Sequence, residues 1–222
     1  MKRLLLVVAL LLLPSSASAD AFADLDSAYA AGLDAHPELF AAVAVAQPRT
    51  TRAGTLRFYA DAHMLDPAAT PAIAHRLVHG DDSDDVRRAL AERLLRVDSS
   101  WDGLRLRLLT TDTSDAVRAM MVASLRTMAP APAREGLEAA LGDKSSRVRR
   151  EAVAVVARRP DAADLVPLLI PALADAAPDV RLQAVRSLDA VAPAEVLALP
   201  AFGALLHDPD PRVVKATRRA LE

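Results

Sequence analysis

The sequence predicts an all-α fold, namely an α-solenoid built from stacked antiparallel helix pairs. One observation behind this prediction is a motif that recurs five times along the chain at nearly constant spacing. The other is that the apolar residues within each copy follow the period of an α-helix. Regular recurrence of this kind is typical of architectures in which each repeat buries its apolar face only against its neighbours.

The recurring motif is an Asp, four further residues, a Val and then usually an Arg. Its valines, which serve as markers of the repeats, are Val86, Val117, Val148, Val180 and Val213, at steps of 31 to 33 residues. Five residues before each marker stands an aspartate: Asp81, Asp112, Asp143, Asp175 and Asp208. The residues that follow the markers are Arg87, Arg118, Arg149 and Arg181, with Val214 in the last repeat.

A helix is expected to begin just before each marker. In the fourth repeat, Val180, Ala184, Val185 and Leu188 form one helical stripe. Two residues before the marker, three repeats carry a side chain that we expect to act as an N-cap: Asp84, Asp115 and Ser146. The other two repeats carry a proline there, which suits the first turn of a helix: Pro178 and Pro211.

A second apolar run precedes each aspartate turn and predicts the other helix of the pair. These runs occupy residues 104–109, 137–141, 165–173 and 199–206. Pro167 and Pro200 both lie thirteen residues before their markers, where the first helix is expected to start or kink.

These helix pairs and their Asp and Val-Arg signature resemble HEAT repeats, specifically the short bacterial type related to phycobilisome-lyase repeats. The resemblance covers about five repeats in residues 67–222. It implies that the turn aspartate and the arginine of the neighbouring repeat form a ladder, which pairs Arg87, Arg118 and Arg149 with Asp112, Asp143 and Asp175. A bidentate pairing between guanidinium and carboxylate would make these residues scaffold. The resemblance is specific for architecture and nearly silent on activity.

The N-terminus predicts export. Lys2 and Arg3 precede an apolar run at residues 4–13, and a small-residue cleavage signature ends at Ala19. We therefore expect a signal peptide at residues 1–19 and a periplasmic or secreted protein. Ten apolar residues are too few to span a bilayer, which takes about 20, and we expect no transmembrane segment after cleavage.

Residues 20–66 differ from the repeats because they hold five of the seven aromatic residues. Helices are expected at residues 21–32, 37–47 and 51–64, and the last two form a degenerate repeat in our interpretation. An atypical terminal unit is what closes the open end of a solenoid, so this segment is predicted to be a helical cap. An aromatic binding patch is the alternative.

Composition excludes several classes of function. Removing the leader takes away two cations and lowers the net charge from −2 to about −4, so nucleic acid is not an expected partner. The chain has no Cys, which excludes disulfides and thiolate chemistry. It also lacks the Gly-x-Ser-x-Gly, His-Glu-x-x-His and Gly-rich phosphate motifs. We therefore predict neither a cofactor nor an enzyme.

Three histidines are a candidate metal site. His75 and His79 lie one helical turn apart, at positions that are mostly apolar in the other repeats, and His63 belongs to the preceding helix. A cluster of three imidazoles is a common metal-binding set. The alternative is that His75 and His79 hydrogen-bond to backbone carbonyls or solvent at a thinly buried seam.

Two functional hypotheses follow. The first is an interaction scaffold that binds a protein or peptide, with an acidic segment, on the face of the second helices. Its candidate residues lie two, three and six residues after the markers: Arg88, Glu92, Met120, Arg150, Glu151, Gln183, Arg186, Lys215 and Arg219. The second is a binder of metal or a small ligand through the histidines, or a lyase-like enzyme as some HEAT-like relatives are.

Overall fold

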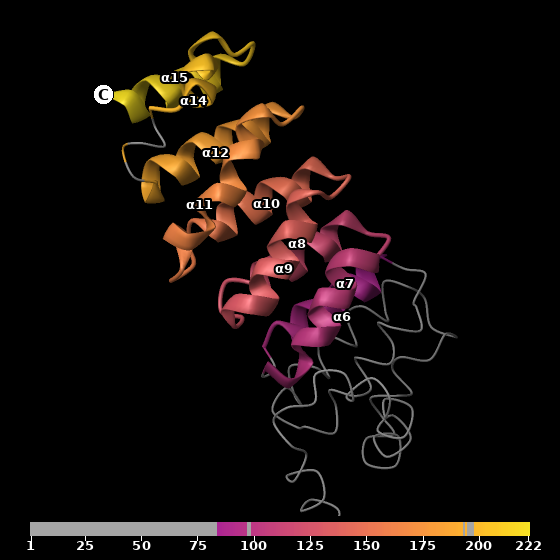
Figure 1. The fold of residues 1–222 in the computed structure, drawn as a ribbon. Helices are drawn as coiled ribbons and strands as arrows, with labels where there is room; N and C mark the ends of the chain where they lie inside the picture. The colour runs from indigo at the N-terminus through magenta and orange to yellow at the C-terminus, as the bar shows by residue number, and fades with distance from the viewer. Residues whose placement is uncertain (1–83, 97–98, 193, 195–197) are drawn as a thin grey trace, which may run out of the picture. The chain divides into compact units, whose positions relative to one another are not determined.

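The structure is a computed structural model that describes residues 84–96, 99–192, 194 and 198–222, all of them in helices, turns and loops (Figure 1). The chain divides into two compact units, Met1–Arg105 and Leu106–Glu222. No helix within the described ranges is long and apolar enough to cross a membrane. The expected signal peptide and the expected cap at residues 20–66 lie outside the described residues.

In the first unit the described residues form α6 (Asp84–Leu94), η1 (Ser99–Trp101) and the start of α7 (Asp102–Thr111), which continues into the second unit. The buried guanidinium of Arg105 donates from Nε and Nη2 to the carbonyl oxygen of Leu94, at 3.1 and 2.8 Å. The last carbonyl groups of a helix accept no backbone hydrogen bond within that helix. Arg105 therefore supplies the missing donor at the C-terminal end of α6.

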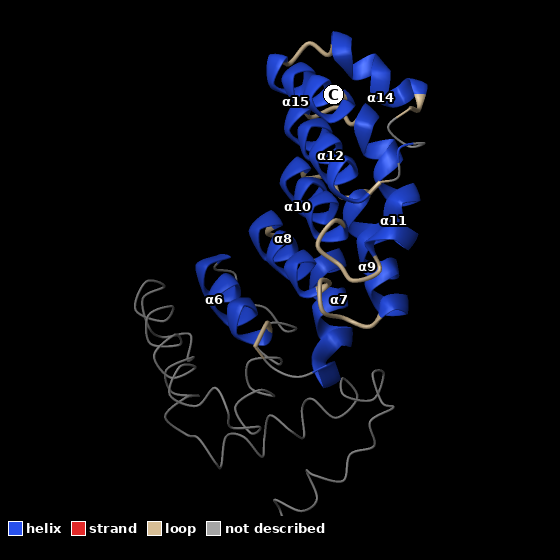
Figure 2. Ribbon diagram, turned by 90° about the vertical axis from the view of Figure 1, so that its left-hand side faces the viewer, coloured by secondary structure: helices blue, strands red, loops and turns tan. Residues whose placement is uncertain are grey.

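The second unit has two layers of helices (Figure 2). One layer holds the second helices of the repeats: α8 (Asp115–Ser124), α10 (Ser146–Val156), α12 (Pro178–Val191) and α15 (Pro211–Leu221). The other holds the first helices: α9 (Pro130–Leu141), α11 (Ala162–Leu169) with η2 (Ile170–Ala174), and α14 (Pro200–Ala204) with η3 (Leu205–His207). Each second helix packs on the next, α8 on α10, α10 on α12 and α12 on α15. The predicted α-solenoid of helix pairs is confirmed.

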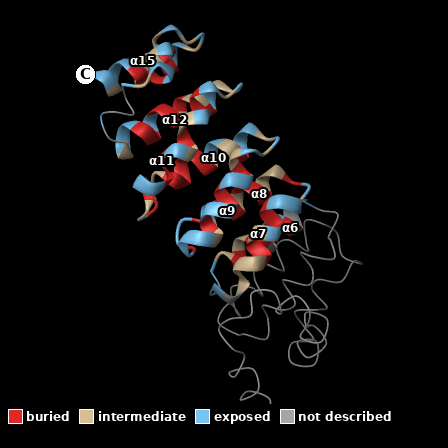
Figure 3. Cartoon of the chain, in the orientation of Figure 1, coloured by how far each residue is buried: buried red, intermediate tan, exposed pale blue. Residues whose placement is uncertain are grey.

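The core lies between the layers and between successive repeats (Figure 3). The marker valines of the second unit, Val117, Val148, Val180 and Val213, are all 0% exposed. The other members of the stripe predicted in the fourth repeat, Ala184, Val185 and Leu188, are also buried. Removing this apolar surface from water is the main force that joins one repeat to the next.

The predicted N-caps are wrong by one residue. Asp115 and Ser146 are the first helical residues of α8 and α10, and the caps are Ser114 and Ser145, whose side chains accept no capping bond. The period of the repeat locates a helix end only to within about one or two residues. In both turns the carboxylate of the preceding aspartate accepts a hydrogen bond from the amide of the cap residue, as Asp143 Oδ1 does from Ser145 N at 2.7 Å.

Three of the four prolines fulfil their predicted roles. Pro178 and Pro211 occupy the first position of α12 and α15, where the missing N–H costs no hydrogen bond. Pro200 begins α14 in the same way, whereas Pro167 lies inside α11, which ends two residues later at Leu169.

Replacing Val148 with Asp should destabilise the protein by at least about 4 kcal/mol, because a buried carboxylate would have no partner. Urea unfolding followed by far-UV circular dichroism measures this change. Ser146→Asp is the matched control, since it adds the same charge at the exposed first position of the same helix and should change stability by at most about 0.5 kcal/mol. Equal stabilities of the two variants would contradict the repeat register.

Candidate binding surface

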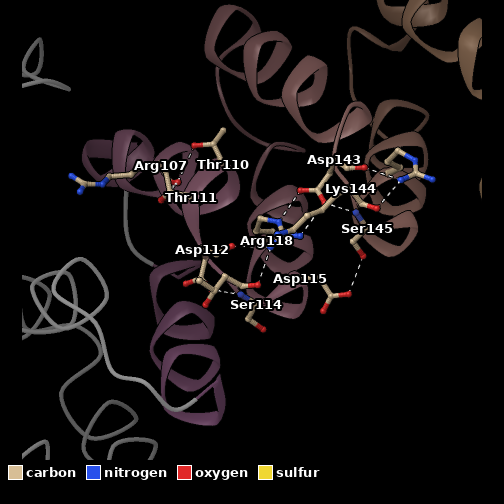
Figure 4. A network of polar contacts seen from close by, with 12 residues as sticks. Arg107, Thr110, Thr111, Asp112, Ser114, Asp115, Arg118, Asp143, Lys144 and Ser145 are labelled. Carbon is tan, nitrogen blue, oxygen red and sulfur yellow. Dashed lines mark hydrogen bonds and ion pairs between the residues drawn. The ribbon is translucent and has the colours of Figure 1, made fainter.

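The turns of the second unit are joined by a ladder of ion pairs, shown for one step in Figure 4. Arg118 donates from Nε and Nη2 to the two carboxylate oxygens of Asp143 in the next repeat, at 2.7 and 3.0 Å. Its Nη1 donates to the carbonyl oxygen of Asp112 in its own turn at 2.8 Å. One guanidinium therefore binds two successive turns.

The same arrangement recurs in the next two repeats. Arg149 binds both oxygens of Asp175 at 2.7 and 2.8 Å, and Arg181 binds both oxygens of Asp208 at 2.6 and 2.8 Å. The Nη1 atoms donate to the carbonyls of Asp143 and Asp175, at 2.7 and 2.8 Å. The expected pairs Arg118 with Asp143 and Arg149 with Asp175 are confirmed, and Arg181 with Asp208 extends the ladder.

The ladder lowers the pKa values of its aspartates. The hydrogen bonds from Arg149 and Arg181 lower the pKa of Asp175 and of Asp208 below the usual value. Burial pushes the pKa of Asp143 upward, but the bonds from Arg118 and the Ser145 amide outweigh burial and lower it. These carboxylates are thus held ionised by their partners. Because arginines of the fold bind both oxygens of each carboxylate, the ladder has a structural role.

Further polar contacts tie successive repeats together. Ser145 Oγ donates to Asp115 Oδ2 at 2.9 Å, and Ser187 Oγ on α12 donates to the carbonyl of Val153 on α10 at 3.0 Å. The buried Arg159, which follows α10, donates from Nη1 to the carbonyl oxygens of Leu125 and Met128 after α8. Sequence reasoning missed Arg159, and its neighbours carry no signal that would separate it from an exposed arginine.

The candidate binding residues lie at surface positions of the second helices. Arg150, Arg186, Lys215 and Arg219 are exposed, and Met120, Glu151 and Gln183 are half-buried. Arg88 is exposed and Glu92 is half-buried, and both lie on α6 in the first unit. Within the described part of the chain, no carboxylate forms an ion pair with Arg150, Arg186, Lys215 or Arg219. We call the seven residues of the second unit the second-helix surface.

The layer of first helices has a different charge pattern. Its exposed charges include Glu135, Asp164, and the pair Arg134 and Glu138, whose Nε and Oε1 atoms are 3.0 Å apart.

Sequence reasoning also left Arg218 out of the candidate set. It is exposed on α15 at the position that is a buried valine in the three preceding repeats, so a charge at a core position was the available signal. Among the described residues, exposed cations that form no ion pair thus gather on the second helices of this unit.

The candidate metal ligands His63, His75 and His79 lie outside the described residues. Among the residues that are described, no three His, Asp or Glu side chains come together in a way that could hold a metal ion.

No protein-family model and no curated protein matches the chain. Solved structures do match it. Escherichia coli YibA is similar with a TM-score of 0.57 and 18% identity, over 90% of this chain and 74% of that one. A designed armadillo repeat protein has a TM-score of 0.47 and 20% identity, over 83% of this chain and 98% of that one. Human deoxyhypusine hydroxylase has a TM-score of 0.43 and 18% identity, over 89% and 94%.

At this identity the likeness to YibA shows the fold alone. Together with the helix pairs and the turn ladder, it defines the chain as a helical-repeat protein with a HEAT-like α-solenoid fold.

Replacing Arg149 with Met should lower the free energy of unfolding by about 2–3 kcal/mol, because Asp175 and the turn carbonyl of Asp143 lose their donors while the alkyl packing is kept. Urea denaturation at neutral pH measures the loss. The adjacent Arg150→Met is the control and should change stability by at most about 0.5 kcal/mol. If both variants lose the same stability, the ladder does not stabilise the fold.

Acid should weaken the ladder. A carboxyl whose pKa is lower in the folded than in the unfolded state contributes stability that is complete above the unfolded pKa, about 3.9, and is lost as pH falls through the folded pKa. The lowered pKa values of Asp143, Asp175 and Asp208 therefore predict a fall in stability below about pH 4. Urea denaturation across a pH series should show a shallower fall for Asp175→Asn than for the unchanged protein, and parallel curves would contradict this.

Proposed function

We propose that the protein is a non-catalytic interaction scaffold of the cell envelope that binds a segment of another protein on its second-helix surface. The observation that carries this proposal is the contrast between adjacent arginines. Arg149 is committed to the ladder, whereas Arg150 on the next helical position is exposed and makes no ion pair with a described residue. Long side chains that the fold does not use are available to a partner.

The arrangement of the layer supports the same proposal. The helices α8, α10, α12 and α15 lie side by side, so equivalent positions of successive repeats face one way (Figure 2). A binding segment that crosses the layer meets one repeat after another. A long surface of this kind suits recognition of a protein better than that of a small molecule, which binds in a concave pocket.

The envelope location and the absence of catalysis rest on the sequence. The leader at residues 1–19 favours export, and the chain carries none of the catalytic motifs named above. We therefore expect the partner among exported or envelope proteins.

Site-specific photo-crosslinking in the native organism tests this function. A photoreactive residue in place of Gln183, half-buried on α12, should form a crosslink to one discrete protein. The matched control is the same residue in place of Leu168, which is equally half-buried but lies on α11 in the other layer and should form none. Crosslinks from Leu168 alone would show that the face is wrong, and none from either position would overturn the scaffold proposal.

A further inference from the structure

The cations of the second-helix surface occupy two levels of the helix layer. Arg150 on α10 and Lys215 on α15 lie two residues after their markers, whereas Arg186 on α12 and Arg219 on α15 lie six residues after. Positions four residues apart lie one above the other on the same face of a helix. The four cations therefore share one face of the layer, on three successive helices.

Recognition on this face depends on charge because little apolar surface is offered. Among the residues whose burial is described, only Leu221 is a large apolar side chain with substantial exposure, at 44%. Leu182 and Ala154, which occupy the alternative levels on α12 and α10, are buried. A partner thus meets exposed guanidinium and ammonium groups on this face. The complementary chemistry is a set of carboxylates.

The fold sets the spacing of those carboxylates. Packed helices are about 8–10 Å apart, and an extended chain advances about 3.3 Å per residue, so a segment that crosses the layer passes one helix roughly every three residues. Arg150 and Arg186 also differ by four residues in level, which is about 6 Å along the helix axis. A segment therefore needs roughly three or four residues to pass from Arg150 to Arg186. Arg186 and Arg219 are on the same level.

A continuous polyanion fits this face less well. Glu151 stands beside Arg150, and the exposed Asp189 lies on α12 with Arg186. A polymer with a phosphate on every unit would place negative charges next to these carboxylates and be repelled by them. A peptide can instead carry carboxylates only at the residues that lie opposite the cations. The net charge of −2 over the whole chain also disfavours binding driven by charge density alone.

We propose that the second-helix surface recognises an extended acidic segment of a partner protein with a carboxylate at every third or fourth residue. Arg150, Arg186 and Arg219 each bind one carboxylate, and Lys215 adds charge at the α15 end. This inference rests on the proposed scaffold function and specifies the chemistry of its partner. Arginine suits the role because its planar fork can bind a carboxylate through two parallel hydrogen bonds.

Two fluorescent peptides of equal length and composition test the spacing. One carries Glu at every third residue, and the other carries the same glutamates consecutively. Anisotropy titrations of the chain without its expected leader, residues 20–222, at low ionic strength should show tighter binding of the spaced peptide. Binding should weaken as salt is added, because these cations are exposed to solvent. Equal affinities for the two peptides, or tighter binding of inorganic polyphosphate, would overturn the proposal.

Charge reversal tests the residues. The double variant R186E/R219E should bind the spaced peptide about tenfold more weakly, since each exposed ion pair contributes up to about fivefold and reversal adds repulsion. The matched control R126E/R158E makes the same change of charge at exposed arginines just after α8 and α10, outside the second-helix surface, and should keep the affinity. An equal loss in both variants would mean that only net charge matters, which overturns the inference.

The two proposals fail separately. A partner crosslinked from Gln183 together with no preference for the spaced peptide removes the acidic-spacing inference and leaves the scaffold function intact. If neither Gln183 nor Leu168 forms a crosslink while the spaced peptide binds as expected, the surface recognises the predicted chemistry but the scaffold function in the cell is contradicted.

Discussion

The architecture of the second unit depends on one interaction, the bidentate bond between an arginine at the start of a second helix and the aspartate in the next turn. Each guanidinium also holds the carbonyl of its own turn, as Arg149 does with Asp143 and Asp175. Each carboxylate in addition accepts an amide two residues further on. The conformation of one turn and its distance from the next are therefore determined together.

Burial and the ladder contribute differently. The marker valines and their apolar neighbours remove their side chains from water, and this supplies most of the stabilisation between repeats. Hydrophobic contact alone is tolerant of small shifts along the helix axis. A partly buried ion pair contributes a modest net free energy because desolvation offsets the attraction, but its geometry allows only one register. The ladder thus selects the stacking that the apolar core stabilises.

This register also determines what the surface can offer. Consecutive residues of a helix point about 100° apart, so Arg149 on α10 faces the next repeat while Arg150 faces solvent. Arg149 and Arg150 have opposite roles for this reason. With the stacking distance set by core and ladder, the exposed cations of α10, α12 and α15 acquire a defined spacing. A structural interaction therefore sets the geometry of the proposed binding surface.

The sequence by itself determined the helix pairs and the buried valines, because both repeat with a period that a single chain displays, whereas the ladder partners were implied by the resemblance to HEAT repeats. It placed the caps one residue too late, because the period of the repeat locates a helix end only to within about one or two residues. Only the tertiary structure decided that Arg159 is buried against the end of α8, and that Arg150 and Arg186 meet no described carboxylate. Those outcomes depend on how residues some 30 positions apart in the sequence are placed in space. A repeated sequence pattern gives residue types and their spacing along the chain, but not the distances between atoms of different repeats.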